Sequence, residues 1–125
     1  MIIAIVDDDR HLLNALGKLL SSAGYEPELF ASAEEFLSAA ATSKAQCLVL
    51  DMQLGEMSGL ELIRRLSADG VKLPVICMSG SLQDKFRRAA FALGCFAYLR
   101  KPFDPDLLIA TLENVTGATP PSKKT

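Results

Sequence analysis

Residues 2–9 read IIAIVDDD, a short apolar run that ends directly in three aspartates. Three further apolar runs follow along the chain, CLVL at 47–50, VICM at 75–78 and FAYL at 96–99. Their length, and the β-branched residues in all but the last, predict buried strands. A weaker strand is expected at 28–30. The chain therefore predicts five short strands, most of them enclosed on both faces.

Stretches with a helical spacing of apolar residues separate these runs. In 10–23 the apolar residues recur every three or four positions, and Gly24 then supplies a stop. Later helices are expected to begin after Ser32 and Ser58, each followed three residues on by a glutamate, and after Asp104, which precedes a proline. Strands that alternate with helices predict the α/β class. We expect a flavodoxin-like, doubly wound five-stranded parallel sheet of order 2-1-3-4-5 with five helices.

The composition fits one domain without a membrane anchor. The chain has 125 residues, and 13 basic against 15 acidic side chains give a net charge of −2, which argues against direct nucleic-acid binding. No apolar run approaches the ~20 residues that cross a bilayer, and no signal peptide is apparent, so a cytoplasmic location is expected. Residues 1–117 are expected to form the domain. Residues 118–125, ATPPSKKT, are expected to form a disordered polar tail or the start of a linker.

The three cysteines, Cys47, Cys77 and Cys95, lie apart in the sequence within apolar surroundings. Their odd number and their spacing predict small buried side chains and argue against a disulfide framework or a zinc site. His11 is the single histidine of the chain, which argues against His-rich metal sites and Ser-His-Asp catalysis.

Polar side chains follow four of the predicted strands. In chain order these are Asp7 and Asp8, then Asp51, then Ser79 and Gly80, and finally Lys101. Because the carboxyl ends of parallel strands meet at one edge of the sheet, we expect these residues to lie close together. Helix capping is an alternative role that fits Asp9, but it does not account for the other three aspartates together. Crowded carboxylates favour a bound cation, and all-oxygen ligands suit Mg²⁺.

Asp51 follows the expected central strand and is the best placed of these residues to react. A carboxylate can attack phosphorus and form an acyl phosphate, while Mg²⁺ orients the phosphoryl group and offsets its charge. Lys101 supplies a positive charge for a phosphoryl oxygen. The Ser79 hydroxyl and the Gly80 amide can donate hydrogen bonds to the same group.

Four motifs together resemble the receiver domain of bacterial two-component response regulators. They are IVDDD at 5–9, LVLDMQLGEMSGLEL at 48–62, VICMSG at 75–80 and YLRKPF at 98–103. The resemblance covers about residues 1–117. The segment GYEPELFASAEEFL and the SGLEL block are similar to receivers that precede a LuxR-type DNA-binding output domain.

This resemblance implies a role for each matching residue. Asp51 would be the phosphoacceptor, and Asp7, Asp8, Asp51 and the backbone carbonyl of Gln53 would hold Mg²⁺. Ser79 and Lys101 would grip the phosphoryl group, and Tyr98 would turn inward on activation. The side chains of Gln53 and Ser81 would tune dephosphorylation.

The implied function is phosphoryl transfer to Asp51 from a phosphohistidine of a sensor histidine kinase or a histidine phosphotransfer protein. The transfer would switch a protein-interaction surface, and the chemistry would be self-catalysed only, so the chain would not be an enzyme. One alternative is an interaction domain of the same fold that works without phosphorylation. Another is a haloacid-dehalogenase-like phosphohydrolase, which needs a second aspartate where this chain has Gln53 and a cap domain for which no residues remain.

The stretch 82–93 offers a candidate partner surface. Its helical spacing puts one apolar group on the core side: Leu82, Phe86, Ala89, Ala90 and Leu93. Phe91 falls on the opposite side, among Asp84, Arg87 and Arg88. Single exposed apolar side chains are ordinary, but an aromatic ring flanked by arginines is also a common interface anchor. We predict that Phe91 is exposed and contacts a partner or a second receiver after phosphorylation. The resemblance places a homodimer on the face formed by this helix, the strand at 96–99 and the last helix.

Overall fold

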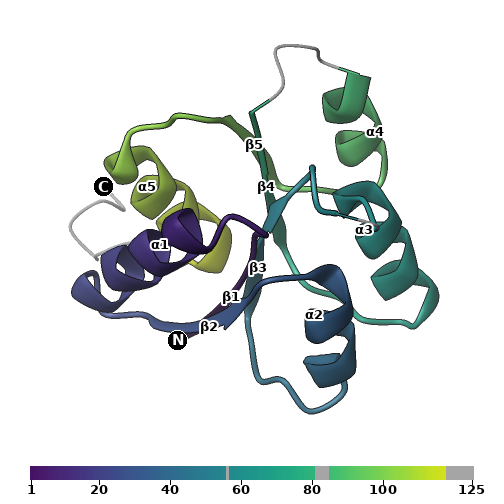
Figure 1. The fold of residues 1–125 in the computed structure, drawn as a ribbon, viewed down its shortest axis with the longest axis horizontal. Coiled ribbons are helices and arrows are strands. Elements are labelled where there is room, and N and C mark those ends of the chain that lie inside the picture. Colours follow the sequence, from purple (N-terminus) through teal and green to yellow (C-terminus); the bar gives the residue numbers. More distant parts are fainter. Residues whose placement is uncertain (56, 81–84, 118–125) are drawn as a thin grey trace.

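The computed structural model describes residues 1–55, 57–80 and 85–117 (Figure 1). Within this part of the chain, strands and helices alternate, and the parallel strands form one sheet of order β2-β1-β3-β4-β5. The predicted fold class and strand order are therefore confirmed. The strands are β1 (Ile2–Val6), β2 (Glu26–Phe30), β3 (Cys47–Asp51), β4 (Val75–Ser79) and β5 (Ala97–Arg100). The helices are α1 (Arg10–Ser22), α2 (Ala33–Ala40), α3 (Gly59–Ala68), α4 (Lys85–Ala92) and α5 (Pro105–Thr116).

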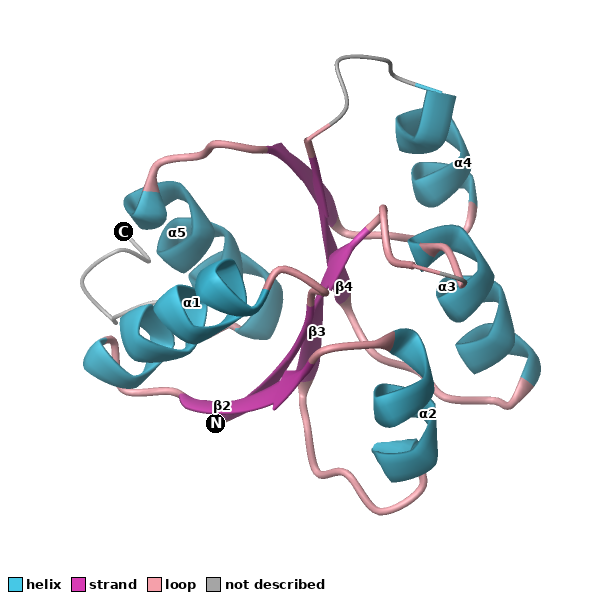
Figure 2. Ribbon diagram, viewed as in Figure 1, coloured by secondary structure: helices cyan, strands magenta, loops and turns pink. Residues whose placement is uncertain are grey.

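Two layers of helices enclose the sheet (Figure 2). Helices α1 and α5 cover one face, and α2, α3 and α4 cover the other (Figure 1). Alternate side chains of each strand point to opposite faces, so Ile76 and Met78 pack beneath α1 and α5, whereas Val75 and Cys77 pack beneath α3 and α4. The central strands β3 and β4 are buried along their whole length, which explains their continuous apolar sequence.

The helix starts follow the predicted capping residues. Ser58 and Glu61 form a reciprocal capping box at the start of α3, and Asp104 accepts a hydrogen bond from the Asp106 amide at the start of α5. Ser32 accepts from the Glu35 amide, but the Glu35 carboxylate reaches past Ser32 to the Ala31 amide. The α2 cap is therefore shifted by one residue from a standard capping box.

Two predicted strand starts were wrong. Strand β2 begins at Glu26, two residues before the expected position, because its register with β1 pairs Ile2 with Glu26. Phe96 was expected in a buried strand, but β5 begins at Ala97 and the Phe96 side chain is 48% exposed. The sheet ends at β5, so a side chain at the entry to this strand gains less cover than one in a central strand.

Several predictions concern residues outside the described part of the chain. They are the core position of Leu82, the placement of Asp84 beside Phe91, the role of Ser81, and the tail at 118–125. Among the residues that the structure describes, every helix is too short or too polar to cross a membrane.

Gly59 fixes how closely α3 approaches the end of β3. Its amide donates a hydrogen bond to the Met52 carbonyl at 3.0 Å. A Cβ at this position would lie 2.7 Å from the Asp51 carbonyl oxygen and 2.8 Å from the Met52 Cα. Backbone atoms cannot yield as a flexible side chain can, so only glycine allows this contact. The first residue of α3 thereby holds the backbone of Asp51 in place.

Replacing Gly59 by alanine should destabilise the fold by about 1–3 kcal/mol, because the added methyl group overpacks against backbone. Urea unfolding measures the change. Gly55→Ala is the matched control, since a Cβ at Gly55 meets nothing within 4 Å. Equal midpoints for the two variants would contradict the role assigned to Gly59.

Candidate functional site

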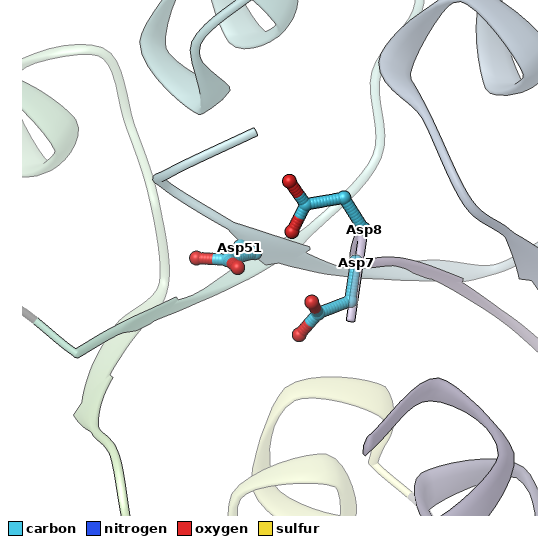
Figure 3. A group of neighbouring side chains, drawn as sticks. All are labelled: Asp7, Asp8 and Asp51. Atoms are coloured by element: carbon cyan, nitrogen blue, oxygen red, sulfur yellow. The ribbon is translucent and has the colours of Figure 1, made fainter. Parts of the chain in front are cut away.

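Three aspartates converge at the carboxyl edge of the sheet. Asp7 follows β1 directly, and Asp51 is the last residue of β3. These strands are neighbours, with Val6 paired to Leu50, so the two aspartates come side by side. Asp8 extends the group, and one carboxylate oxygen from each of the three residues lies within 4.8 Å of the others (Figure 3). The predicted cluster of Asp7, Asp8 and Asp51 is therefore present.

Lys101 bridges two of these carboxylates. Its Nζ donates to Asp7 Oδ2 at 2.9 Å and to Asp51 Oδ2 at 3.0 Å. Lys101 comes directly after β5, and its own amide donates to the Ser79 carbonyl at 2.8 Å. Strand β4 lies between β3 and β5, so the long lysine side chain spans the end of β4 to reach the central strands. The bridge joins segments that are far apart in the sequence.

Backbone amides hold the remaining carboxylate oxygens. Asp7 Oδ1 accepts from the Asp9 amide at 2.9 Å, and Asp51 Oδ1 accepts from the Gln53 amide at 3.0 Å. In both carboxylates a backbone amide therefore binds Oδ1 and Lys101 binds Oδ2, so the orientation of each carboxylate is fixed. Asp7 is fully buried and Asp51 is 4% exposed, whereas Asp8 is exposed. The exposed Asp9 carboxylate instead caps α1, as the capping alternative predicted.

Burial dominates the electrostatics of Asp51. Loss of solvent raises the pKa of Asp51, against the lowering effects of the Gln53 amide and Lys101, and the nearby Asp7 adds to the rise. Burial alone would lower the pKa of Lys101, but its hydrogen bonds and charge interactions with Asp7 and Asp51 outweigh burial and raise it. The ammonium group therefore remains charged within the cluster.

The charges of the cluster leave room for a metal ion. Three carboxylates and one ammonium group carry two uncompensated negative charges when ionised. Their donors are all oxygens, one carboxylate is exposed to solvent, and the ligand atoms are close together. This donor set fits a hard divalent cation that keeps part of its water shell. The cluster could therefore bind a metal.

The other predicted site residues surround this cluster. Ser79 is buried at the end of β4, and Tyr98 is half-buried in β5 among side chains of the face covered by α3 and α4. Gln53 and Gly80 are exposed near each other, since a Cβ on Gly80 would lie 3.9 Å from Gln53 Oε1. The structure thus brings the strand ends of β1, β3, β4 and β5 to one site.

Phe91 lies on the surface of α4, away from the acidic cluster. Its side chain is 42% exposed, and the Arg87 guanidinium lies over the ring, with Cζ 5.5 Å from the ring centroid. The predicted exposure of Phe91 is confirmed, and its contact with a partner stays a prediction. Phe96 before β5 and Leu107 in α5 are also exposed apolar side chains, which the sequence reasoning did not single out.

The sequence reasoning also missed an apolar groove beside Lys101. The groove encloses about 380 Å³ between α1 and the segment that joins β5 to α5. Apolar residues line it: Leu12, Ala15, Leu16, Leu19, Pro102, Phe103 and Pro105. The sequence did contain a sign of this groove, because α1 has more leucines than its buried face holds. Leu12 and Leu19 flank the core positions of α1 and remain partly exposed.

Comparisons with known proteins agree with this geometry. The model of the response regulator receiver domain matches residues 3–113, so the chain belongs to this family. The transcriptional regulatory protein FixJ of Bradyrhizobium diazoefficiens is 33% identical over 122 residues, which cover 98% of this chain and 60% of FixJ. The response regulator protein TodT of Pseudomonas putida is 36% identical over 111 residues, which cover 89% of this chain and 49% of TodT. The chain thus spans about half to three-fifths of the length of these relatives.

A solved structure gives the same result for the fold. The CheY-like receiver domain from Methanospirillum hungatei superposes with a TM-score of 0.87 at 26% identity, covering 94% of both chains. The protein is therefore a response regulator receiver domain with a CheY-like arrangement of strands and helices.

Replacing Lys101 by methionine should destabilise the folded state by about 3 kcal/mol at pH 7, because two buried carboxylates lose their shared counter-charge. The deficit should shrink as pH falls through the raised pKa of Asp51 towards the ordinary value of 3.8. In that interval the folded variant binds a proton that the unfolded chain does not, so lower pH favours folding. Urea unfolding of both proteins from pH 7 to about 5 measures this trend.

Lys44→Met is the matched control, because Lys44 is exposed and lies outside the cluster. The control should match the parent protein at every pH. A Lys101→Met deficit that stays constant across the range would show that Lys101 does not compensate Asp51.

Proposed function

We propose that Asp51 accepts a phosphoryl group from a phosphohistidine of a sensor histidine kinase or a histidine phosphotransfer protein. The observation that carries this proposal is the lysine bridge, which holds a buried, oriented carboxylate beside a positive charge at the end of a central strand. An Asp51 oxygen attacks phosphorus, and the bond from phosphorus to the histidine nitrogen breaks. The products are an acyl phosphate on Asp51 and a free imidazole, which takes a proton from solvent.

The residues around Asp51 prepare it for this transfer. The Gln53 amide fixes one carboxylate oxygen, and Lys101 holds the other. The Lys101 ammonium has three N–H donors and uses two of them on Asp7 and Asp51, which leaves one for a further oxygen ligand. After transfer, the Lys101 ammonium can bind a phosphoryl oxygen, and the Ser79 hydroxyl and the Gly80 amide can donate to the same group. Gln53 lies beside Gly80 at the mouth of the site, which supports its role in tuning dephosphorylation. Ser81, assigned the same role, lies outside the described residues.

The metal that we assign to this site is Mg²⁺. Asp7, Asp8, Asp51 and the backbone carbonyl of Gln53 would hold it, in keeping with the all-oxygen donor set. Bound Mg²⁺ would orient the phosphoryl group and offset its charge. Asp8 is the exposed member of the acidic group, so it gives the ion a route from solvent into the site.

A protein donor is supported by the apolar groove beside Lys101. Leu12 and Leu19 of α1 and Phe103 after β5 present apolar surface beside Lys101, whose ammonium binds Asp51. A small phosphodonor has no use for such a surface, whereas a helical phosphotransfer partner can bury it while placing its histidine near Asp51.

The output that we propose is a change of the surface formed by α4, β5 and α5. A phosphoryl group adds about −1.5 to −2 charges next to Ser79, and this residue and Tyr98 are the proposed switch. Phe91, Phe96 and Leu107 are exposed on α4, before β5 and on α5, which supports a homodimer or partner contact there. We place the receiver domain at residues 1–117, since the last helix ends at Thr116, and assign 118–125 to a tail or linker.

Acetyl phosphate and Mg²⁺ should add one phosphoryl group to the parent protein, and Asp51→Asn should abolish the adduct because an amide is a poor nucleophile. Intact-mass spectrometry measures the adduct, and hydroxylamine should remove it as it does other acyl phosphates. Asp69→Asn, at an exposed position after α3, is the matched control and should keep the adduct. A full adduct on Asp51→Asn would refute the assignment of the phosphoacceptor.

Removing the Asp8 carboxylate should weaken Mg²⁺ binding about tenfold or more, because the site loses a charged ligand. Ligand binding to the folded state raises Tm, so a thermal titration with MgCl₂ measures the affinity without phosphoryl transfer. Asp9→Asn is the control, since its carboxylate caps α1 and lies outside the cluster. If Asp9→Asn weakens binding and Asp8→Asn does not, the ligand assignment is wrong.

A further inference from the structure

Helices α1 and α5 lie next to each other on one face of the sheet and carry opposite charges. Both pack on the same core cluster, and both contribute to the lining of the apolar groove (Figure 1). The charged residues of α1 are all basic, namely Arg10, His11 and Lys18. Those of α5 are all acidic, namely Asp106 and Glu113. The outer surface of this helix layer is therefore basic along one helix and acidic along the other.

The solvent side of α1 carries a small residue between two basic ones. The opposite side, which packs on the sheet, is marked by buried leucines: Leu13, Leu16 and Leu20. At about 100° per residue, His11, Ala15 and Lys18 fall on the side that points away from the sheet. All three are exposed. We call these three residues the basic ridge.

The solvent side of α5 repeats this spacing with the opposite charge. Leu108 and Leu112 are fully buried and mark the side that packs on the sheet. Asp106, Ala110 and Glu113 fall on the other side, where the first two are exposed and Glu113 is half-buried. These three residues form the acidic ridge. A small residue again separates two side chains of like charge.

The two ridges also match in height and direction. Each begins at the second residue of its helix, and each follows the spacing i, i+4, i+7, which is about 6 Å and then about 4.5 Å along the helix axis. Helix α1 follows β1 and α5 follows β5, so both helices start at the carboxyl edge of the parallel sheet. The charged positions of one ridge therefore lie level with those of the other.

We propose that the α1–α5 face binds a second copy of this chain. A two-fold axis that runs along the groove, parallel to both helices, places α1 of one copy against α5 of the other and keeps these helices parallel. Lys18 then lies opposite Glu113, and His11 lies opposite Asp106. The alanines meet between these pairs, and the symmetry forms every contact twice. This surface is separate from the face of α4, β5 and α5 that we assign to output.

Charge selects this arrangement over the other two-fold arrangement of the same face. An axis perpendicular to the helices would place α1 against α1 and α5 against α5, so like charges would face each other. The axis along the groove pairs every basic position with an acidic one. Within the part of the chain that the structure describes, Lys18 forms no ion pair, so its charge is available to a partner.

The apolar groove supplies the centre of the interface. Leu12 and Leu19 are partly exposed and lie on the side of the basic ridge that faces α5. Ile109 is also partly exposed, and it lies one turn after Pro105, which lines the groove. In the dimer the grooves of the two copies meet at the axis, and their side chains become the centre of a four-helix arrangement. The alanines in the ridges allow the facing helices to approach closely.

The dimer would cover the groove that we assign to a phosphodonor protein. A receiver would then have to leave the dimer before its Asp51 could meet a protein donor. The dimer would thus limit phosphoryl transfer at high receiver concentration. This consequence alone rests on the proposed function, whereas the association itself needs neither a phosphoryl group nor Mg²⁺.

Charge reversal tests the pairing of the two ridges. Sedimentation velocity of the unphosphorylated parent without Mg²⁺ should show a monomer–dimer equilibrium, which about 0.5 M NaCl should weaken. Lys18→Glu should weaken self-association about tenfold or more, because both contacts with Glu113 then join like charges. Glu113→Lys should have the same effect. An equimolar mixture of the two variants should associate like the parent, since both contacts of the mixed dimer again join opposite charges.

Lys44→Glu is the matched control, because it makes the same change of charge at an exposed position outside the α1–α5 face, and it should associate like the parent. Cross-linking supplies a measurement that needs no variant. A carbodiimide should form an amide bond between Lys18 and Glu113 in a mixture of isotope-labelled and unlabelled parent. Mass spectrometry should then find labelled peptides joined to unlabelled ones, which only a contact between two copies can give.

Three results would each overturn the proposal. The first is a parent that stays monomeric up to about 1 mM. The second is a mixture of the two variants that associates no better than either variant alone. The third is an association that Phe91→Ala abolishes and Lys18→Glu leaves unchanged, which would place the contact on α4. Because no phosphodonor is used, a failure of phosphoryl transfer to Asp51 would leave all of these measurements unchanged.

Discussion

The bridge from Lys101 to Asp7 and Asp51 is the interaction on which the rest of this structure depends. Two carboxylates that are almost without solvent would repel each other strongly, and one ammonium group at 2.9 and 3.0 Å compensates both. The bridge requires β1, β3 and β5 to end at the same level of the sheet. The parallel order β2-β1-β3-β4-β5 meets this requirement, and the helices on both faces keep the central strands β3 and β4 buried up to their last residues.

The same arrangement explains why the site can be both stable and reactive. Lys101 compensates the charges of the cluster only in part, so the three carboxylates could bind a divalent cation. Backbone amides fix one oxygen of Asp7 and of Asp51, which keeps the reacting carboxylate in one orientation. Gly59 supports this geometry because it has no side chain, which allows the start of α3 to pack directly against the backbone of Asp51. The packing of α3 at Gly59 and the hydrogen bonds from Lys101 and the Gln53 amide therefore all act on Asp51.

The surfaces around the site differ in character, and each suits a different task. The groove beside α1 is apolar and adjoins Lys101, and we assign it to the proposed binding of a phosphodonor protein. The surface of α4, β5 and α5 carries the exposed side chains of Phe91 and Leu107, and it is the surface to which we assign the proposed output.

The sequence by itself determined the α/β fold class, the capped starts of the helices and the group of aspartates at the carboxyl ends of the strands. These features follow from local periodicity and from the residues that come directly after each strand. It predicted Asp7, Asp8, Asp51, Ser79 and Lys101 as neighbours, since parallel strands end at a common edge. Only the tertiary structure decided which oxygens Lys101 binds, that Phe96 is exposed, and that Cys77 and Cys95 are buried on one face of the sheet while Cys47 is buried on the other. These outcomes depend on how a turn is tied to two elements at once and on which face of a strand a helix covers. Such contacts join residues distant in sequence, and no local pattern encodes them.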